Sequence, residues 1–74
     1  MTRLFWDFFG PAAEKLASHQ LEHLAHFLAR EQRHAHASGV ESRAALHSAA
    51  WVDLDDADAE PVAATLRVKR REAR

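Results

Sequence analysis

A long stretch near the N-terminus has the hydrophobic pattern of an amphipathic helix. Its apolar residues recur every three or four positions and fall within one narrow arc at about 100° per residue. The members of this arc are Ala13, Ala17, Leu21, Leu24 and Leu28, with Leu16 and Phe27 at its border. Gly10 and Pro11 suit a helix start, and Gly39 lies where a C-terminal cap is expected. The pattern predicts one long helix from about Pro11 to His36.

The segment before this helix, Arg3 to Phe9, is apolar on both of the sides that a strand presents. Its alternating sets are Leu4, Trp6 and Phe8 on one side and Phe5, Asp7 and Phe9 on the other. Aromatic residues favour strands, and two apolar faces are typical of a central strand. We therefore expect a short central strand, with a helical turn as the alternative that such a short run leaves open.

Two further segments alternate with a period of two. The ranges Val40–Ala45 and Ser48–Leu54 predict a hairpin with its turn around Leu46 and His47. The turn lacks Asn-Gly or Asp-Gly, and alanine is a weak strand former. A helix through Glu41–Ala50 is therefore the competing interpretation.

The C-terminal third begins with an acidic run and ends with a basic one. Proline is tolerated in a first helical turn, so Asp58 as cap and Pro61 behind it predict a short helix to about Leu66. Leu66–Lys69 can alternate as a final strand, and a basic tail follows from about residue 69. The acidic start suits the positive end of the helix dipole.

The predicted order is strand, helix, strand, strand, helix, strand. This order indicates an α+β, ferredoxin-like β-α-β-β-α-β fold, with both helices on one face of an antiparallel sheet. The whole chain, residues 1–74, then forms a single small domain. The alternative is a small three-helix domain whose middle helix spans Glu41–Ala50 and places Trp51 in a helix interface.

Composition limits the function classes. With 74 residues, the chain buries only about 60% of its unfolded surface, so its core is marginal and a partner surface would help. The absence of Cys excludes disulfides, thiolate nucleophiles and Cys-zinc sites. The net charge of −1 gives no global field that would select nucleic acid or an anionic membrane. The N-terminal apolar run is interrupted by Asp7 and is too short for an export signal or a spanning helix, so we expect a cytoplasmic protein without a membrane partner.

An aromatic sheet face is the first candidate site. Trp51 has the opposite parity to Val52 and Leu54, which places it on the uncovered side of the predicted sheet, where Phe5 and Phe9 can join it. Contiguous exposed aromatics mark interfaces or ligand grooves. A homodimer packed through this face would supply the missing core and enclose a cavity for a small apolar ligand. The alternative is that Trp51 packs within the monomer against the tail or the hairpin.

A histidine stripe is the second candidate site. His19, His23 and His26 follow one another at i, i+4 and i+7, opposite the leucine arc. Such a pair can chelate zinc, nickel or copper, although Glu22 has the wrong offset for the base of a metalloprotease helix. His34 and His36 are further possible ligands from a second helix across a dimer. The alternative is a solvated helix face without bound metal.

Other chemistries find little support in the sequence. Residues 47–54 match an RNA-binding octamer only in part, and the acidic run offsets the basic tail, so nucleic acid is not an expected partner. The acidic run has Asp58 where a calcium loop requires glycine. Ser48 lacks the context of a catalytic serine, and Gly10 and Gly39 are isolated rather than part of a phosphate loop. We therefore expect a non-catalytic binding or assembly module, with a transition-metal binding protein as the alternative.

Overall fold

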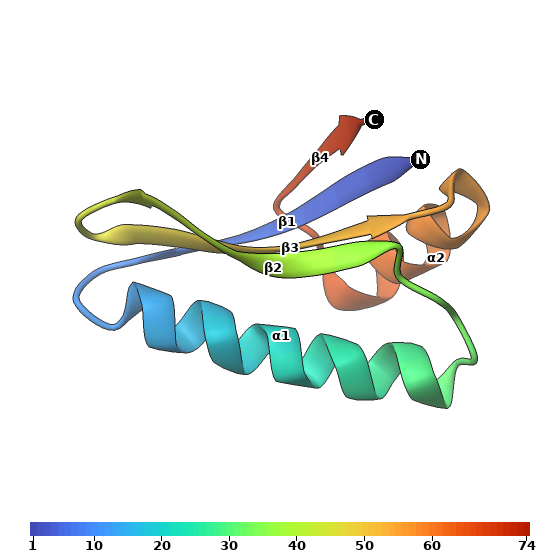
Figure 1. Ribbon diagram of the computed structural model, residues 1–74, viewed down its shortest axis with the longest axis horizontal. Helices are drawn as coiled ribbons and strands as arrows, with labels where there is room; N and C mark the ends of the chain where they lie inside the picture. The colour runs from blue at the N-terminus through green and yellow to red at the C-terminus, as the bar shows by residue number, and fades with distance from the viewer.

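The computed structural model describes residues 1–74 as a four-stranded antiparallel sheet with two helices (Figure 1). The predicted α+β class is confirmed. The elements in chain order are β1 (Thr2–Phe9), α1 (Ala13–Arg30), β2 (Ala37–Ala44), β3 (His47–Leu54), α2 (Asp56–Leu66) and β4 (Arg70–Ala73).

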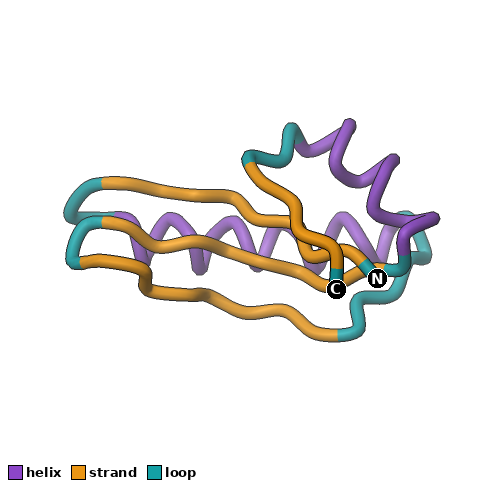
Figure 2. The backbone as a smooth tube through the Cα atoms, turned by 90° about the horizontal axis from the view of Figure 1, so that it is seen from above, coloured by secondary structure: helices purple, strands orange, loops and turns teal.

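The strands lie side by side in the order β2-β3-β1-β4, and all neighbouring pairs are antiparallel. Figure 2 shows α1 running along the length of the sheet and both termini at the same end. Both helices pack on one side of the sheet, so the other side, which we call the open face, is covered by no helix.

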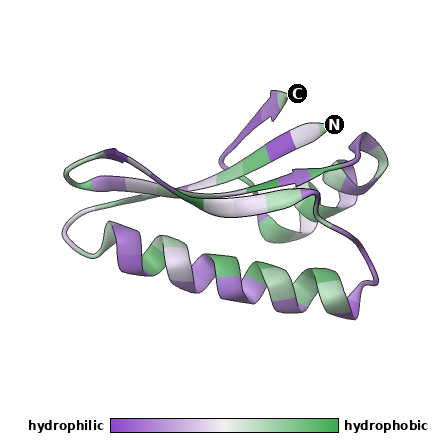
Figure 3. Ribbon diagram, viewed as in Figure 1, coloured by the Kyte–Doolittle hydropathy of each residue, from purple (hydrophilic) through white to green (hydrophobic).

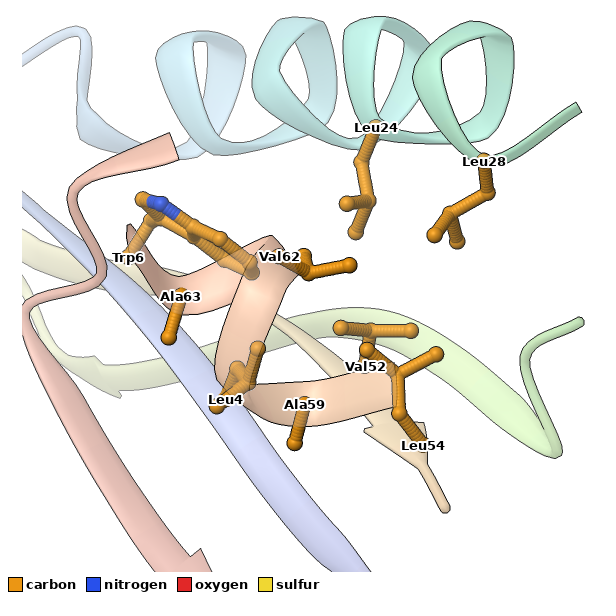
Figure 4. Packing of buried hydrophobic residues seen from close by; sticks show 9 residues of the cluster. All are labelled: Leu4, Trp6, Leu24, Leu28, Val52, Leu54, Ala59, Val62 and Ala63. Atoms are coloured by element: carbon orange, nitrogen blue, oxygen red, sulfur yellow. The ribbon is translucent and has the colours of Figure 1, made fainter. Parts of the chain in front are cut away.

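The core lies between the sheet and the two helices (Figure 4). Aliphatic side chains of both helices meet alternate residues of the two central strands. The nine buried residues of this cluster are Leu4, Trp6, Leu24, Leu28, Val52, Leu54, Ala59, Val62 and Ala63. The burial of β1 explains its two-sided apolar pattern, because β1 lies between β3 and β4 and its middle residues are buried on both faces.

Helix α1 ends six residues earlier than predicted, at Arg30 rather than His36. The N–H groups of Gln32 and Arg33 bond back to the carbonyls of Ala29 and Leu28, at 3.2 and 2.9 Å. This is the Schellman arrangement, with Gln32 in the left-handed conformation (φ 57°) that glycine usually occupies. Gly39, the predicted cap, instead lies inside β2.

The competing helix through Glu41–Ala50, and with it the three-helix alternative, is wrong. β2 and β3 form a hairpin whose turn is Ala45 and Leu46, one residue before the predicted position. Pairing outweighs the weak strand propensity of alanine here, because β3 is bonded on both sides and its Ala49 and Ala50 are fully buried.

Helix α2 begins at Asp56, with Asp55 rather than Asp58 as its N-cap. The backbone carbonyl of Asp55 accepts the N–H groups of Asp58 and Ala59. Pro61 therefore lies beyond the first turn, as the sixth residue of the helix. Asp58 instead pairs with Arg33, at 2.6 Å between Nη1 and Oδ1.

The last strand is not Leu66–Lys69 but Arg70–Ala73, within the segment that we expected as a basic tail. Arg67 ends α2 in the left-handed conformation (φ 53°), and the carbonyl of Leu66 accepts the indole N–H of Trp6 at 3.1 Å. Leu66 is therefore the last residue of α2 and Arg67 its C-terminal cap, and neither belongs to a strand. β4 is hydrophilic (Figure 3) and pairs with Thr2–Phe5.

Candidate functional site

The open face carries alternate residues of all four strands. The register places Phe5 between Trp51 of β3 and Arg70 of β4, and it places Phe9 opposite His47. Its members are Arg3, Phe5, Asp7 and Phe9 from β1, Ala37, Gly39 and Glu41 from β2, His47, Ala49, Trp51 and Asp53 from β3, and Arg70 and Glu72 from β4. Aromatic and charged residues therefore share this surface.

The indole of Trp51 lies across β2 at Gly39. A Cβ atom at Gly39 would be only 3.0 Å from Cζ2 of Trp51, so a larger residue there would push the ring away. On its other side, the guanidinium carbon of Arg3 lies 3.9 Å from the ring centroid. Trp51 is thus held within the monomer between glycine and arginine and is only partly exposed.

A carboxylate fixes the position of Arg3. Asp53 accepts from Nε and Nη2 of Arg3 at 2.6 and 2.9 Å, in a two-pronged pair. The hydrogen bonds from Arg3 hold the pKa of the Asp53 carboxyl below its usual value, despite the burial that opposes ionisation. The two hydrogen bonds therefore hold the guanidinium group of Arg3 over the Trp51 ring.

Phe5 is covered in the same way from the other side. The guanidinium carbon of Arg70 lies 4.0 Å from the Phe5 ring centroid, and Phe5 is only 2% exposed. Arg70 donates from Nε and Nη2 to Asp7 at 2.9 and 3.0 Å. Each of the two rings at the centre of the face therefore has an arginine above it that a carboxylate holds in place.

Asp7 contacts two side chains at the centre of the face. Besides Arg70 it contacts Nε2 of His47 at 2.9 Å, and its side chain is only 11% exposed. The hydrogen bond from Arg70, followed by that from His47, holds the pKa of Asp7 below its ordinary value. Asp7 in turn raises the pKa of Arg70.

Phe9 is the exception on this surface. Its ring stacks on His47, with centroids 4.3 Å apart and planes 20° apart, yet 71% of the residue is exposed. Among the residues of the four strands, it is the one large apolar side chain left in solvent. The part of the open face that a partner can reach therefore comprises Phe9, the partly exposed Trp51 and the side chains of the two arginines, together with the exposed carboxylates of Glu41 and Glu72.

The three predicted aromatic residues all lie on this face, with very different exposure. Phe5 is buried, Trp51 is partly covered and Phe9 is open. Sequence reasoning missed the two arginines, their carboxylates and Gly39. These residues have the same strand parity as Trp51 or Phe5, which was the available signal. Pairing each arginine with its carboxylate requires the register between segments 50 and 63 residues apart.

The predicted metal residues lie on the solvent side of α1. Nε2 of His19 and Nε2 of His23 are 3.2 Å apart, whereas His26 has no such contact. The early end of α1 removes His34 and His36 from this helix, and His36 instead contacts Asp55 at 2.8 Å. Nowhere do three His, Cys, Asp or Glu side chains form a group suited to hold a metal ion.

Comparisons with protein-family models, with curated proteins and with solved structures gave no match to this chain. Neither helix is both long and apolar enough to cross a bilayer.

Proposed function

We propose that this chain is a non-catalytic assembly module that forms a homodimer by packing its open face against the open face of a second copy. The observation that carries the proposal is Phe9, a large apolar side chain that is 71% exposed on a sheet face without a helix. Two sheets packed face to face lie about 10 Å apart, which lets such a side chain reach the opposite sheet.

The small size of the core supports this proposal. Only 16 of 74 residues are buried, so a second copy would add apolar contacts that one chain lacks. A standard interface covers about 800 Å² per partner, which is roughly a sixth of the 4715 Å² surface of the chain. A two-fold dimer needs one self-complementary patch of that size.

The rigid arrangement of the arginines also supports it. Arginine and aromatic residues are enriched in interfaces, and a side chain that is already fixed loses little entropy on binding. Arg3 and Arg70 are held by Asp53 and Asp7 before any partner arrives. The carboxylates also balance the two positive charges, so two copies can approach without strong repulsion.

The open face favours a second copy over a small ligand. The two cavities of the chain lie along α1, and neither is lined by residues of the open face. A ligand such as the small apolar molecule that the sequence suggested would have to bind between two facing sheets. Self-association is accordingly the primary role that we propose.

A matched pair of variants tests the homodimer by native mass spectrometry. Phe9→Glu places a charge in the proposed interface, while Leu16→Glu places one at an exposed apolar position of α1 (45% exposed). We expect dimers for the wild type and for Leu16→Glu, and a folded monomer for Phe9→Glu. A wild-type monomer, or a Phe9→Glu dimer as tight as the wild type, would overturn the proposal.

We also propose that the fold is the ferredoxin-like arrangement. The element order supports it, as does the strand order, which is β4-β1-β3-β2 when it is read from the other edge. NMR contacts between α-protons test the register, because Arg3 should be near Asp53 on one side and Glu72 on the other. Absence of the contact between Arg3 and Glu72 would contradict the position of β4.

Metal binding on α1 is a second candidate function, favoured by the 3.2 Å distance between Nε2 of His19 and Nε2 of His23. Two imidazoles one helical turn apart can bind one zinc or nickel ion, with water completing its coordination. Calorimetry with chelator-treated protein and nickel tests this. His23→Ala should abolish binding and His26→Ala, the matched control, should retain it. Equal binding by the two variants would exclude the pair as the site.

A further inference from the structure

One edge of the sheet is free along a full strand. β2 pairs with β3 on one side and has no strand on the other, over eight residues. The antiparallel register leaves the backbone groups of alternate β2 residues directed outward. Such an edge can accept the main chain of an added strand.

An apolar groove lies directly beside this edge, between α1 and β2. Its volume is about 330 Å³, and seven of its ten lining residues are hydrophobic. Leu24, Leu28 and Val52 line its interior, and the exposed Ala25 and Ala29 line it on α1. Ligand pockets begin at about 300 Å³, so the groove has room for an apolar side chain.

The groove has a polar end. Arg33, His34 and Ser38 contribute to its lining where α1 passes into β2. Arg33 contacts Asp58 through Nη1 only, which leaves the donors on Nε and Nη2 free. His34 is exposed and makes no side-chain hydrogen bond within the chain. These groups are suited to a carboxylate.

The direction in which β2 runs agrees with the position of these groups. Arg33 and His34 precede β2, so they lie at its N-terminal end. A strand that adds antiparallel to β2 therefore has its own C-terminus at this end. A terminal carboxylate and the last side chain of such a strand would reach the polar end and the apolar groove together.

We propose that the edge of β2 and the adjoining groove bind the C-terminal segment of a partner protein. The segment adds to β2 as an antiparallel strand, places an apolar last side chain in the groove and presents its carboxylate to Arg33 and His34. This site is separate from the open face, and it would give the module a binding function in addition to self-association.

Two other occupants fit less well. The residues that β2 itself directs toward the helix side are Ser38, Val40 and Ser42, so the β2 of a second copy offers the apolar groove only the short side chain of Val40. The β4 segment of this chain is already paired with β1, and the N–H of Arg74 bonds to the Met1 carbonyl at 2.8 Å, so this segment is not available to β2. A separate partner with an apolar last residue is the better match.

The first test is selection from a library of heptapeptides with free carboxyl ends and random last four residues. We expect the wild-type protein to retain peptides with an apolar last residue. Amidation of the selected peptides should weaken binding by about tenfold or more, because a hydrogen bond to a charged group is stronger than one to a neutral group. No retained peptide, or equal binding of the amidated forms, would overturn the proposal.

Matched variants then locate the site on the selected peptides. Ala29→Phe fills the groove and should abolish binding, whereas Ala57→Phe, at an exposed alanine of α2, should not change it. His34→Ala removes one carboxylate contact and leaves Arg33 bonded to Asp58. This variant should weaken the binding of peptides with a free carboxyl end severalfold and leave the binding of amidated peptides unchanged. Binding that survives Ala29→Phe would place the peptide elsewhere and contradict the proposal.

Further measurements distinguish the other occupants. Sodium octanoate is the probe for a small amphiphile. If it binds to the wild type and not to Ala29→Phe, and no peptide binds, the groove is a small-amphiphile site and the peptide proposal is wrong. If Ala29→Phe lowers the solution mass, the edge of β2 is occupied by a second copy instead. The Phe9→Glu variant should bind peptides as the wild type does, so loss of the homodimer leaves this test intact.

Discussion

The two faces of the sheet are shielded from water in different ways. On the covered face, two helices place aliphatic side chains over Leu4, Val52 and Leu54, which are fully buried. On the open face, no helix is present, and arginine side chains of the strands lie over Phe5 and Trp51. One face excludes water with whole elements, and the other does so with individual charged side chains.

This difference has energetic consequences. Burial of aliphatic surface is non-directional and is not subject to ionic screening, whereas an arginine over an aromatic ring depends on the carboxylate that holds it. The covered face should therefore dominate the free energy of unfolding. The open face should contribute less, respond to pH and leave a surface that is ready to contact a partner.

The largest expected effect is on the covered face. Leu24 is 1% exposed, and Leu24→Ala should lower the free energy of unfolding by about 3 kcal/mol through lost burial and the cavity left behind. Urea unfolding measures the loss, which should not change with salt. Leu16→Ala, at an exposed position of the same helix, should cost far less. Similar losses for both variants would refute the assignment of the core.

A smaller loss is expected at the centre of the open face. Asp7→Ala removes the partner of both Arg70 and His47 and should cost about 2 kcal/mol, because it leaves a half-buried charge unpaired. The control is Glu22→Ala, at an exposed residue of α1. If Asp7→Ala costs no more than this control in urea unfolding, the open face is not held together by Asp7.

The two carboxylates that hold the arginines of the open face, Asp7 and Asp53, should make the stability of the chain depend on pH. Because folding lowers the pKa of Asp7 and of Asp53, their stabilising effect is fully present above the ordinary carboxyl pKa of 3.8 and is lost as the pH falls through the lower folded values. The double variant Asp7→Asn, Asp53→Asn should therefore be less stable at neutral pH and lose less stability below about pH 4. Urea titrations across this range would contradict the account if both proteins lost stability equally.

A still smaller effect is expected where Trp51 crosses β2. Gly39→Ala places a methyl group 3.0 Å from the indole, so the ring must tilt into solvent at a cost of about 1 kcal/mol. The tryptophan emission should shift to longer wavelength. Gly10→Ala is the contrasting control, because Gly10 has a φ of +105° and a Cβ atom there would meet nothing within 4 Å. It should destabilise without changing the emission, and a shift in both variants would argue against this packing.

The smallest effect concerns the end of α1, which sets how far the helix extends over the covered face. Gln32→Gly should stabilise the chain by about 0.5–1 kcal/mol, because glycine adopts the left-handed conformation without strain. Gln20→Gly, in the middle of α1, should destabilise it by a similar amount. Thermal unfolding measures both changes. A change of stability in the same direction for the two variants would contradict the left-handed conformation of Gln32.

The elements were largely predictable, whereas several of their boundaries were not. Apolar periodicity located α1, and the two-sided apolar pattern identified β1 as a central strand. The end of α1 was missed because Gln32, rather than a glycine, adopts the left-handed conformation. β4 was misplaced because Leu66–Lys69 alternates like a strand, yet Leu66 closes α2 and contacts Trp6.

The candidate site was predictable only in outline. Parity placed Trp51 on the uncovered side of the sheet, but it could not show that Gly39 and Arg3 enclose the indole. It also could not distinguish buried Phe5 from exposed Phe9. That difference arises from Arg70, a residue of the expected tail that covers Phe5 but does not extend to Phe9.

The solution mass of the wild-type chain, measured by light scattering over a range of concentrations, tests the central claim most directly. If the open face is an interface between two copies, the mass should approach twice 8.3 kDa as concentration rises. A mass that stays at 8.3 kDa at every concentration would show that the arginine-covered face is complete in the monomer and would contradict the account.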